Sequence, residues 1–81
     1  MNIGGMLVVF KNGKRYAYKI KPKTPRKVFL DIANKYIEDK QVSIPHVVEA
    51  LMNNQNISGQ VRFKWYSSLI IDKDTILYES V

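Results

Sequence analysis

Apolar residues recur with the period of a strand near both ends of the chain and with the period of a helix in its middle. The apolar run 6–10 leads to the dipeptide Asn12-Gly13, and apolar and polar residues then alternate over 15–21. Asn-Gly is a strong hairpin signal because both residues tolerate positive φ. Residues 6–21 therefore predict a β-hairpin. Its first strand is apolar on both faces and should lie inside the sheet.

The middle of the chain has the spacing of two amphipathic helices. Thr24 followed by Pro25 predicts an N-cap and the first residue of a helix that extends to Asp39. Ser43, with Pro45 behind it, predicts the start of a second helix, which ends at the polar run 53–56. The expected apolar stripes are Val28, Phe29, Ile32, Ala33, Tyr36 and Ile37 on the first helix, and Ile44, Val47, Val48, Leu51 and Met52 on the second.

Alternation returns after the helices. It predicts a strand over 61–66, which could continue in phase to Ile71, and a last strand over 76–80. The order ββααββ predicts a single α+β domain over residues 6–81, after a flexible N-terminus at residues 1–5. We expect two layers, a four-stranded, mostly antiparallel sheet with both helices on one face.

This order of elements is similar to the β-grasp, or ubiquitin-like, architecture. The resemblance implies that the strand at 6–10 pairs in parallel with the strand at 76–80 in the centre of the sheet. Ubiquitin-like modifiers are conjugated through a terminal Gly-Gly, whereas this sequence ends in Ser80-Val81. We therefore do not expect a modifier role.

Charge is distributed unevenly over the 81 residues and makes an acidic partner a reasonable expectation. The net charge is +6, and residues 1–27 hold eight basic residues and no acidic one. Residues 28–81 hold five basic and seven acidic residues. Such asymmetry favours nucleic acid as the partner. The plain alternative is that the charge only keeps the protein soluble.

The residue types that most enzymes need are scarce. With no cysteine, disulfides, thiol chemistry and cysteine zinc sites are excluded, and a cytoplasmic, intracellular location is favoured. We find neither a signal peptide nor an apolar segment long enough to span a membrane. His46 is the only histidine, and Asp72 and Asp74 have the spacing of turn residues. We expect no enzymatic activity, no cofactor, no metal and no small-molecule substrate.

Basic residues share the outward face of two predicted strands. If both strands belong to one sheet, these cations and a tyrosine line the surface opposite the helices. Several single-strand and RNA binders use such a face to neutralise phosphates and to stack bases. The members expected on this face are Arg15, Lys19, Lys21, Arg62, Lys64 and Tyr66.

Two more basic residues, Arg26 and Lys27, stand at the start of the first predicted helix. The helix dipole disfavours cations there, and an incoming anion would relieve the mismatch. We therefore add both residues to the predicted nucleic-acid interface.

A protein-interaction module is the alternative. Exposed sheet edges, or the face that carries Tyr16 and Tyr18, could pair with another protein or with a second copy in a homodimer. Stretches such as 19–23 (KIKPK) and 34–37 (NKYI) give the chain a composition that resembles small orphan proteins of viruses and plasmids of thermoacidophilic archaea. That resemblance implies an accessory role inside an infected host cell.

Overall fold

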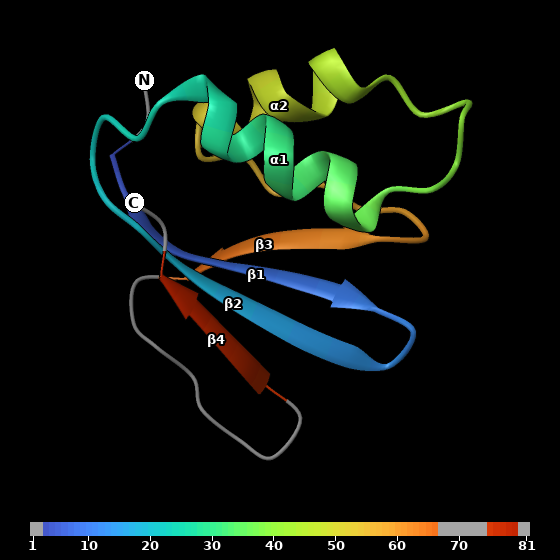
Figure 1. Cartoon of the computed structure of the whole chain (residues 1–81), viewed down its shortest axis with the longest axis horizontal. Coiled ribbons are helices and arrows are strands. Elements are labelled where there is room, and N and C mark those ends of the chain that lie inside the picture. Colours follow the sequence, from blue (N-terminus) through green and yellow to red (C-terminus); the bar gives the residue numbers. More distant parts are fainter. Residues whose placement is uncertain (1–2, 67–74, 80–81) are drawn as a thin grey trace.

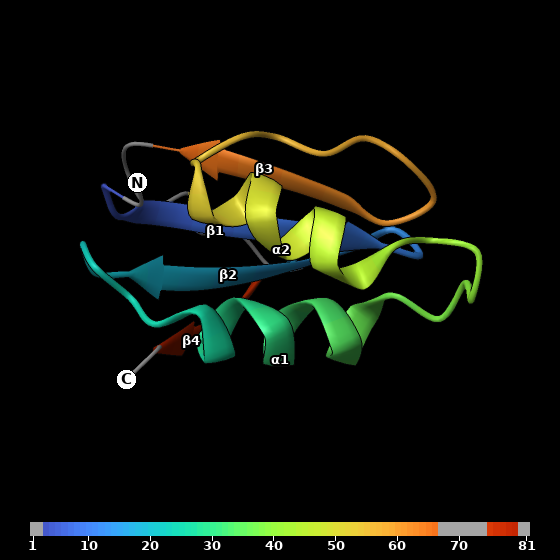
Figure 2. The same ribbon diagram turned by 90° about the horizontal axis from the view of Figure 1, so that it is seen from above.

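The computed structural model describes residues 3–66 and the backbone of a further strand at 75–79. Figure 1 shows two helices packed on one face of a β-sheet. Seen from above in Figure 2, the helices lie side by side across the sheet. The elements are β1 (Gly5–Lys11), β2 (Lys14–Ile20), α1 (Arg26–Tyr36), α2 (Ile44–Met52), β3 (Arg62–Tyr66) and β4 (Thr75–Glu79).

The antiparallel sheet has three strands in the order β2-β1-β3, and its elements follow the chain order ββααβ. The strand β4 pairs only with β2, in parallel. The expected four-stranded, mostly antiparallel sheet of order ββααββ is therefore corrected: the antiparallel sheet has three strands and the order ββααβ, and β4 joins it as a parallel neighbour along the outer edge of β2, which gives the strand order β3-β1-β2-β4. The expected parallel pairing of residues 6–10 with residues 76–80 is wrong. Both sides of β1 are hydrogen-bonded to β2 and β3, and no edge of β1 is left for a further strand.

The first hairpin follows the prediction. Lys11 pairs with Lys14 across the turn, and the turn residues Asn12 and Gly13 have φ values of 53° and 77°. Positive φ at both positions matches the twist of the flanking strands, which is why Asn-Gly suits this turn. The expected position of the first strand inside the sheet is also confirmed, because β1 has a neighbour on each side.

We expect Gly13→Ala to lower the free energy of unfolding by about 1–2 kcal/mol, because a Cβ disfavours left-handed backbone. Nothing lies within 4 Å of a Cβ at this position, so the loss would come from the backbone alone. Gly59→Ala is the matched control, since its φ is not positive and its Cβ would meet only the Val61 carbonyl at 3.6 Å. Urea unfolding followed by the fluorescence of the single tryptophan measures both variants. If Gly13→Ala and Gly59→Ala unfold with equal free energies, the turn does not depend on positive φ at position 13.

The main core lies between the sheet and the helices. It contains the fully buried side chains of Leu7, Val9, Phe63, Phe29 and Leu51. The expected apolar stripes supply the helix side of this core. Members that are only half-buried, such as Val28, Ile44 and Met52, pack around its margin.

The helix α1 is shorter than expected. Its N-cap is Pro25, and the Thr24 hydroxyl donates to the carbonyl of Lys21 at 2.5 Å instead of capping the helix. The helix ends at Tyr36, where Ile37 turns to extended backbone with φ −89° and ψ 115°. The expected cap at Thr24 is therefore wrong, with the helix starting one residue later than expected, and the expected end at Asp39 is wrong by three residues.

The helix α2 begins as expected. The Ser43 hydroxyl accepts a hydrogen bond from the backbone N–H of His46 at 3.4 Å, and Pro45 lies in the first turn. The residue Asn54 then follows the end of the helix and reaches the start of the chain. Its side chain accepts from the Ile3 N–H at 2.8 Å and donates to the Gly4 carbonyl at 3.2 Å. Within the segment 1–5, expected to be flexible, Ile3 and Gly4 are thus held by Asn54, and Gly5 already belongs to β1.

Candidate nucleic-acid interface

The register of the antiparallel sheet places basic residues on both sides of an apolar stripe. Leu7 and Val9 of β1 face the helices, so alternation turns the residues between and beside them to the opposite face. Directly paired residues of neighbouring strands share a face. This face, which we call the basic sheet face, consists of three rows: Tyr66–Met6–Lys19, Lys64–Val8–Ala17 and Arg62–Phe10–Arg15.

The middle of the basic sheet face is apolar and already buried. Met6, Val8 and Ala17 are 7%, 5% and 0% exposed, and they form a second hydrophobic cluster apart from the main core. The rings of Phe10 and Tyr66 are half-buried and pack against this cluster. The face is therefore not the evenly solvated surface that alternation suggested. It has a dry centre with basic and aromatic side chains around it.

The β3 side of the face carries an exposed cation. Arg62 is exposed, and its guanidinium lies 5.1 Å from the centre of the Phe10 ring. Lys64 is half-buried, with its Cα beside that of Val8. No acidic residue occurs in β1, β2 or β3. The antiparallel strands thus supply no carboxylate that could neutralise Arg62 and Lys64.

The β2 side carries Arg15, which is half-buried, and Lys19, which is exposed. The parallel strand β4 brings Glu79 into register with Lys19. An acidic residue therefore stands beside the basic row at this end of the sheet. Each side of the basic sheet face therefore carries two cations, Arg15 and Lys19 on β2 and Arg62 and Lys64 on β3.

The remaining three predicted residues lie off this face. Lys21 follows the end of β2 and is exposed in the turn that Thr24 closes. Arg26 and Lys27 are exposed at the start of α1, in the helix layer. The fold thus brings together five of the eight predicted residues: Arg15, Lys19, Arg62, Lys64 and Tyr66.

The tyrosine surface considered for protein pairing faces the helix layer. The ring of Tyr16 lies 4.9 Å from that of Tyr36 on α1, measured between centroids. The Tyr18 hydroxyl is buried and hydrogen-bonded to the Tyr36 hydroxyl at 2.5 Å. Both tyrosines therefore help to hold α1 on the sheet, and the surface that they would offer to a partner is occupied by this helix.

The free edge of β3 is covered by the loop that precedes it. Ile57 and Phe63 exchange two backbone hydrogen bonds of 2.9 Å. Two residues further along β3, the Trp65 N–H donates to the side-chain oxygen of Asn56 at 2.8 Å. Covering an edge in this way is a common means of preventing strand addition. A second copy could not extend the sheet at β3 without displacing this loop.

The other features that bear on chemistry are few. His46 is exposed on the first turn of α2. In residues 3–66, no three His, Asp or Glu side chains come close enough to hold a metal ion. Neither α1 nor α2 is long and apolar enough to cross a membrane.

The chain was compared with protein-family models, with curated proteins and with solved structures. Nothing matches it.

Proposed function

We propose that this chain is a non-enzymatic protein that binds single-stranded nucleic acid on the basic sheet face. The observation that carries the proposal is the strand register. It places Arg62 and Lys64 on one side of an apolar stripe and Arg15 and Lys19 on the other. Two half-buried rings, Phe10 and Tyr66, lie among these cations.

Phosphate binding falls mainly to the β3 side. Arg62 and Lys64 point to the same face and are about 7 Å apart along the strand. Each can meet a different phosphate of a single strand, which bends freely enough to follow them. The arginine would bind in a forked geometry, whereas the lysine would act as a point charge.

Base stacking falls to Phe10 and Tyr66. Aromatic rings accept any base on their faces, so this contribution is tolerant of sequence. The guanidinium of Arg62 is already held over the Phe10 ring, and a planar guanidinium can itself stack on a base. We therefore expect binding with little sequence preference.

The proposed setting is the interior of a cell. A chain without cysteine needs no oxidising compartment, and nucleic acid is abundant there. An accessory role in a host cell, as the resemblance to archaeal viral and plasmid proteins implies, would be compatible with this binding.

Fluorescence anisotropy of a labelled single-stranded oligonucleotide, titrated at several salt concentrations, tests the proposal. We expect the affinity to fall steeply with salt, because bound cations release counterions from the phosphates. Lys64→Ala should weaken binding to all sequences alike and lower the log–log salt slope by about 1. Lys40→Ala is the matched control, since Lys40 is exposed in the connection between the helices.

Two outcomes would overturn this proposal. One is a Lys64→Ala variant that binds with the affinity and salt slope of the wild type. The other is the absence of binding near physiological salt, together with a protein complex or a dimer that survives high salt in sedimentation. The second outcome would favour the protein-interaction alternative.

A further inference from the structure

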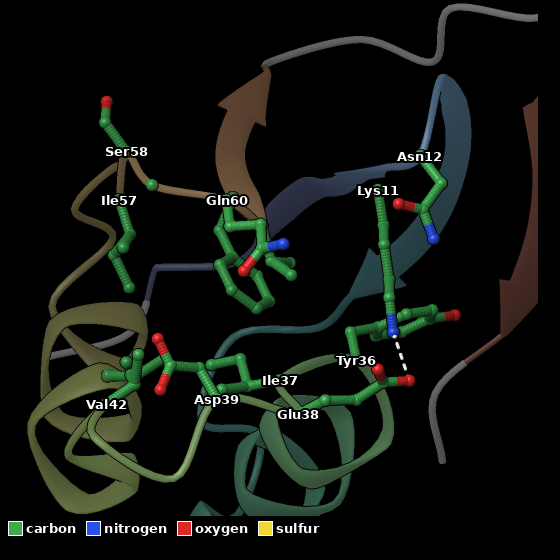
Figure 3. Close-up of a pocket in the computed structure, with 14 residues that line it drawn as sticks. Lys11, Asn12, Tyr36, Ile37, Glu38, Asp39, Val42, Ile57, Ser58 and Gln60 are labelled. Carbon is green, nitrogen blue, oxygen red and sulfur yellow. Dashed lines mark hydrogen bonds and ion pairs between the residues drawn. The ribbon is translucent and has the colours of Figure 1, made fainter.

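A pocket of about 340 Å³ opens at the hairpin end of the molecule, on the helix side of the sheet. Figure 3 shows its two walls, with Ile57, Ser58 and Gln60 on one and Val42, Asp39 and Glu38 on the other. The walls come from the loop before β3 and from the connection between the helices. Sites for small organic ligands typically have volumes of about 300–1,000 Å³. The pocket is therefore large enough for one small molecule.

The pocket is apolar inside. Its lining includes Phe63 and Val47, which are 0% and 4% exposed, and the half-buried Ile37 and Val61. At the mouth stands Val42, which is 37% exposed and is one of two large hydrophobic side chains exposed in the described part of the chain. A ligand with an apolar body would bury the surface that Ile37, Val61 and Val42 still expose and gain free energy from doing so.

The charged groups of the lining favour a cation. Lys11 and Glu38 form an ion pair of 2.9 Å, so each neutralises the other. Asp39 accepts a hydrogen bond from the Gln41 N–H at 2.9 Å, and no basic group of residues 3–66 forms an ion pair with it. The lining therefore carries one excess negative charge, in a protein whose net charge is +6.

We propose that this pocket binds a small amphipathic amine, with its apolar body between Val42 and Ile57 and its ammonium group at Asp39. A carboxylate ligand would have to compete with Glu38 for Lys11 and would lie close to Asp39. A purely polar amine would leave the apolar lining exposed. The combination of an apolar interior and an unpaired carboxylate at the rim selects for a ligand with both properties.

The test is a titration of the ¹⁵N-labelled full chain with three probes, followed by the backbone amide shifts in NMR spectra. Phenethylamine should bind weakly and change the amide chemical shifts of residues 37–42 and 57–61, and these changes should saturate. Ethylamine, which lacks the ring, and hydrocinnamate, which replaces the amine with a carboxylate, should bind far more weakly. Equal binding of phenethylamine and hydrocinnamate, shifts confined to other residues, or no saturable shift with phenethylamine would overturn the proposal.

Asp39→Asn tests the proposed ammonium contact. We expect it to weaken phenethylamine binding by up to about fivefold, the upper end of the range for an exposed ion pair. Asparagine can still accept from the Gln41 N–H, so the turn should remain intact. Asp31→Asn is the matched control, because Asp31 is exposed on α1 and does not line the pocket. Unchanged affinity in Asp39→Asn would exclude the assigned contact. The pocket and the basic sheet face use different residues, so the two proposals can fail separately.

Discussion

Replacing Phe63 with alanine is expected to lower the free energy of unfolding by about 3–5 kcal/mol. The side chain is 0% exposed and belongs to the main core. It also sits where β3 meets both neighbours, in register with Val9 on one side and hydrogen-bonded to Ile57 on the other. Truncation would leave a cavity under the helices and loosen the strand that carries Arg62, Lys64 and Tyr66 of the basic sheet face.

Urea unfolding monitored by far-UV circular dichroism measures this loss. Ile3→Ala is the control, because Ile3 is 74% exposed and surface truncations usually change stability by less than about 0.5 kcal/mol. A domain of this size is stabilised by only about 5–15 kcal/mol, so Phe63→Ala should also unfold at a clearly lower temperature. A loss no larger than that of Ile3→Ala would mean that Phe63 does not occupy the core.

Asn54→Ala is expected to lower the free energy of unfolding by about 2–5 kcal/mol, from two sources. The residue has a φ of 54°, and alanine in left-handed backbone costs about 1–2 kcal/mol. The change also removes the hydrogen bonds to the Ile3 N–H and the Gly4 carbonyl, each worth about 0.5–1.5 kcal/mol. These bonds join the end of α2 to the start of β1.

Asn54→Gly separates the two sources, because glycine accepts positive φ but cannot make the bonds. Its unfolding free energy should lie between those of the wild type and Asn54→Ala. Asn34→Ala controls for the change in residue type, since Asn34 is exposed on α1, where alanine favours the helix. If glycine and alanine at position 54 are equally destabilising, backbone strain plays no part.

Local structure could be predicted from the sequence wherever neighbouring residues determine it. The hairpin turn at Asn12-Gly13 and the cap at Ser43 both depend on side chains and backbone within a few residues. Both are confirmed. The apolar stripes of both helices could also be predicted, because burial of one helix face requires apolar residues at helical spacing in the sequence.

The end of α1 and the strand pairing depend on contacts that a local pattern does not contain. Ile37 and Glu38 continue the helical spacing, yet Ile37 is extended. Glu38, past the helix end, instead pairs with Lys11 of β1, which is distant in the chain. Likewise, alternation identifies residues 62–66 as a strand but does not say which strand lies beside it. The prediction paired β1 with the last strand, whereas β3 occupies that position.

The candidate sites differ in the same way. Five residues of the basic sheet face could be predicted, because alternation within each strand assigns a face. Its buried centre could not, since the burial of Val8 and Ala17 requires knowing what packs against them. The pocket between the helix connection and the loop before β3 had no sequence signal at all. Its walls come from the hairpin turn and two connections, and their meeting depends on the whole fold.

The central position of β1 has a consequence for synthesis on the ribosome. One partner of β1 follows directly in the chain through a tight turn, whereas the other is β3, which is made only after both helices. A hairpin forms in about 1–10 μs, far faster than translation at about 5–20 residues per second. For the seconds between, the growing chain exposes an apolar strand with one open edge, the kind of surface that recruits other strands. Translation speed through residues 21–61 should therefore affect the yield of native protein more than it affects the stability of the finished fold.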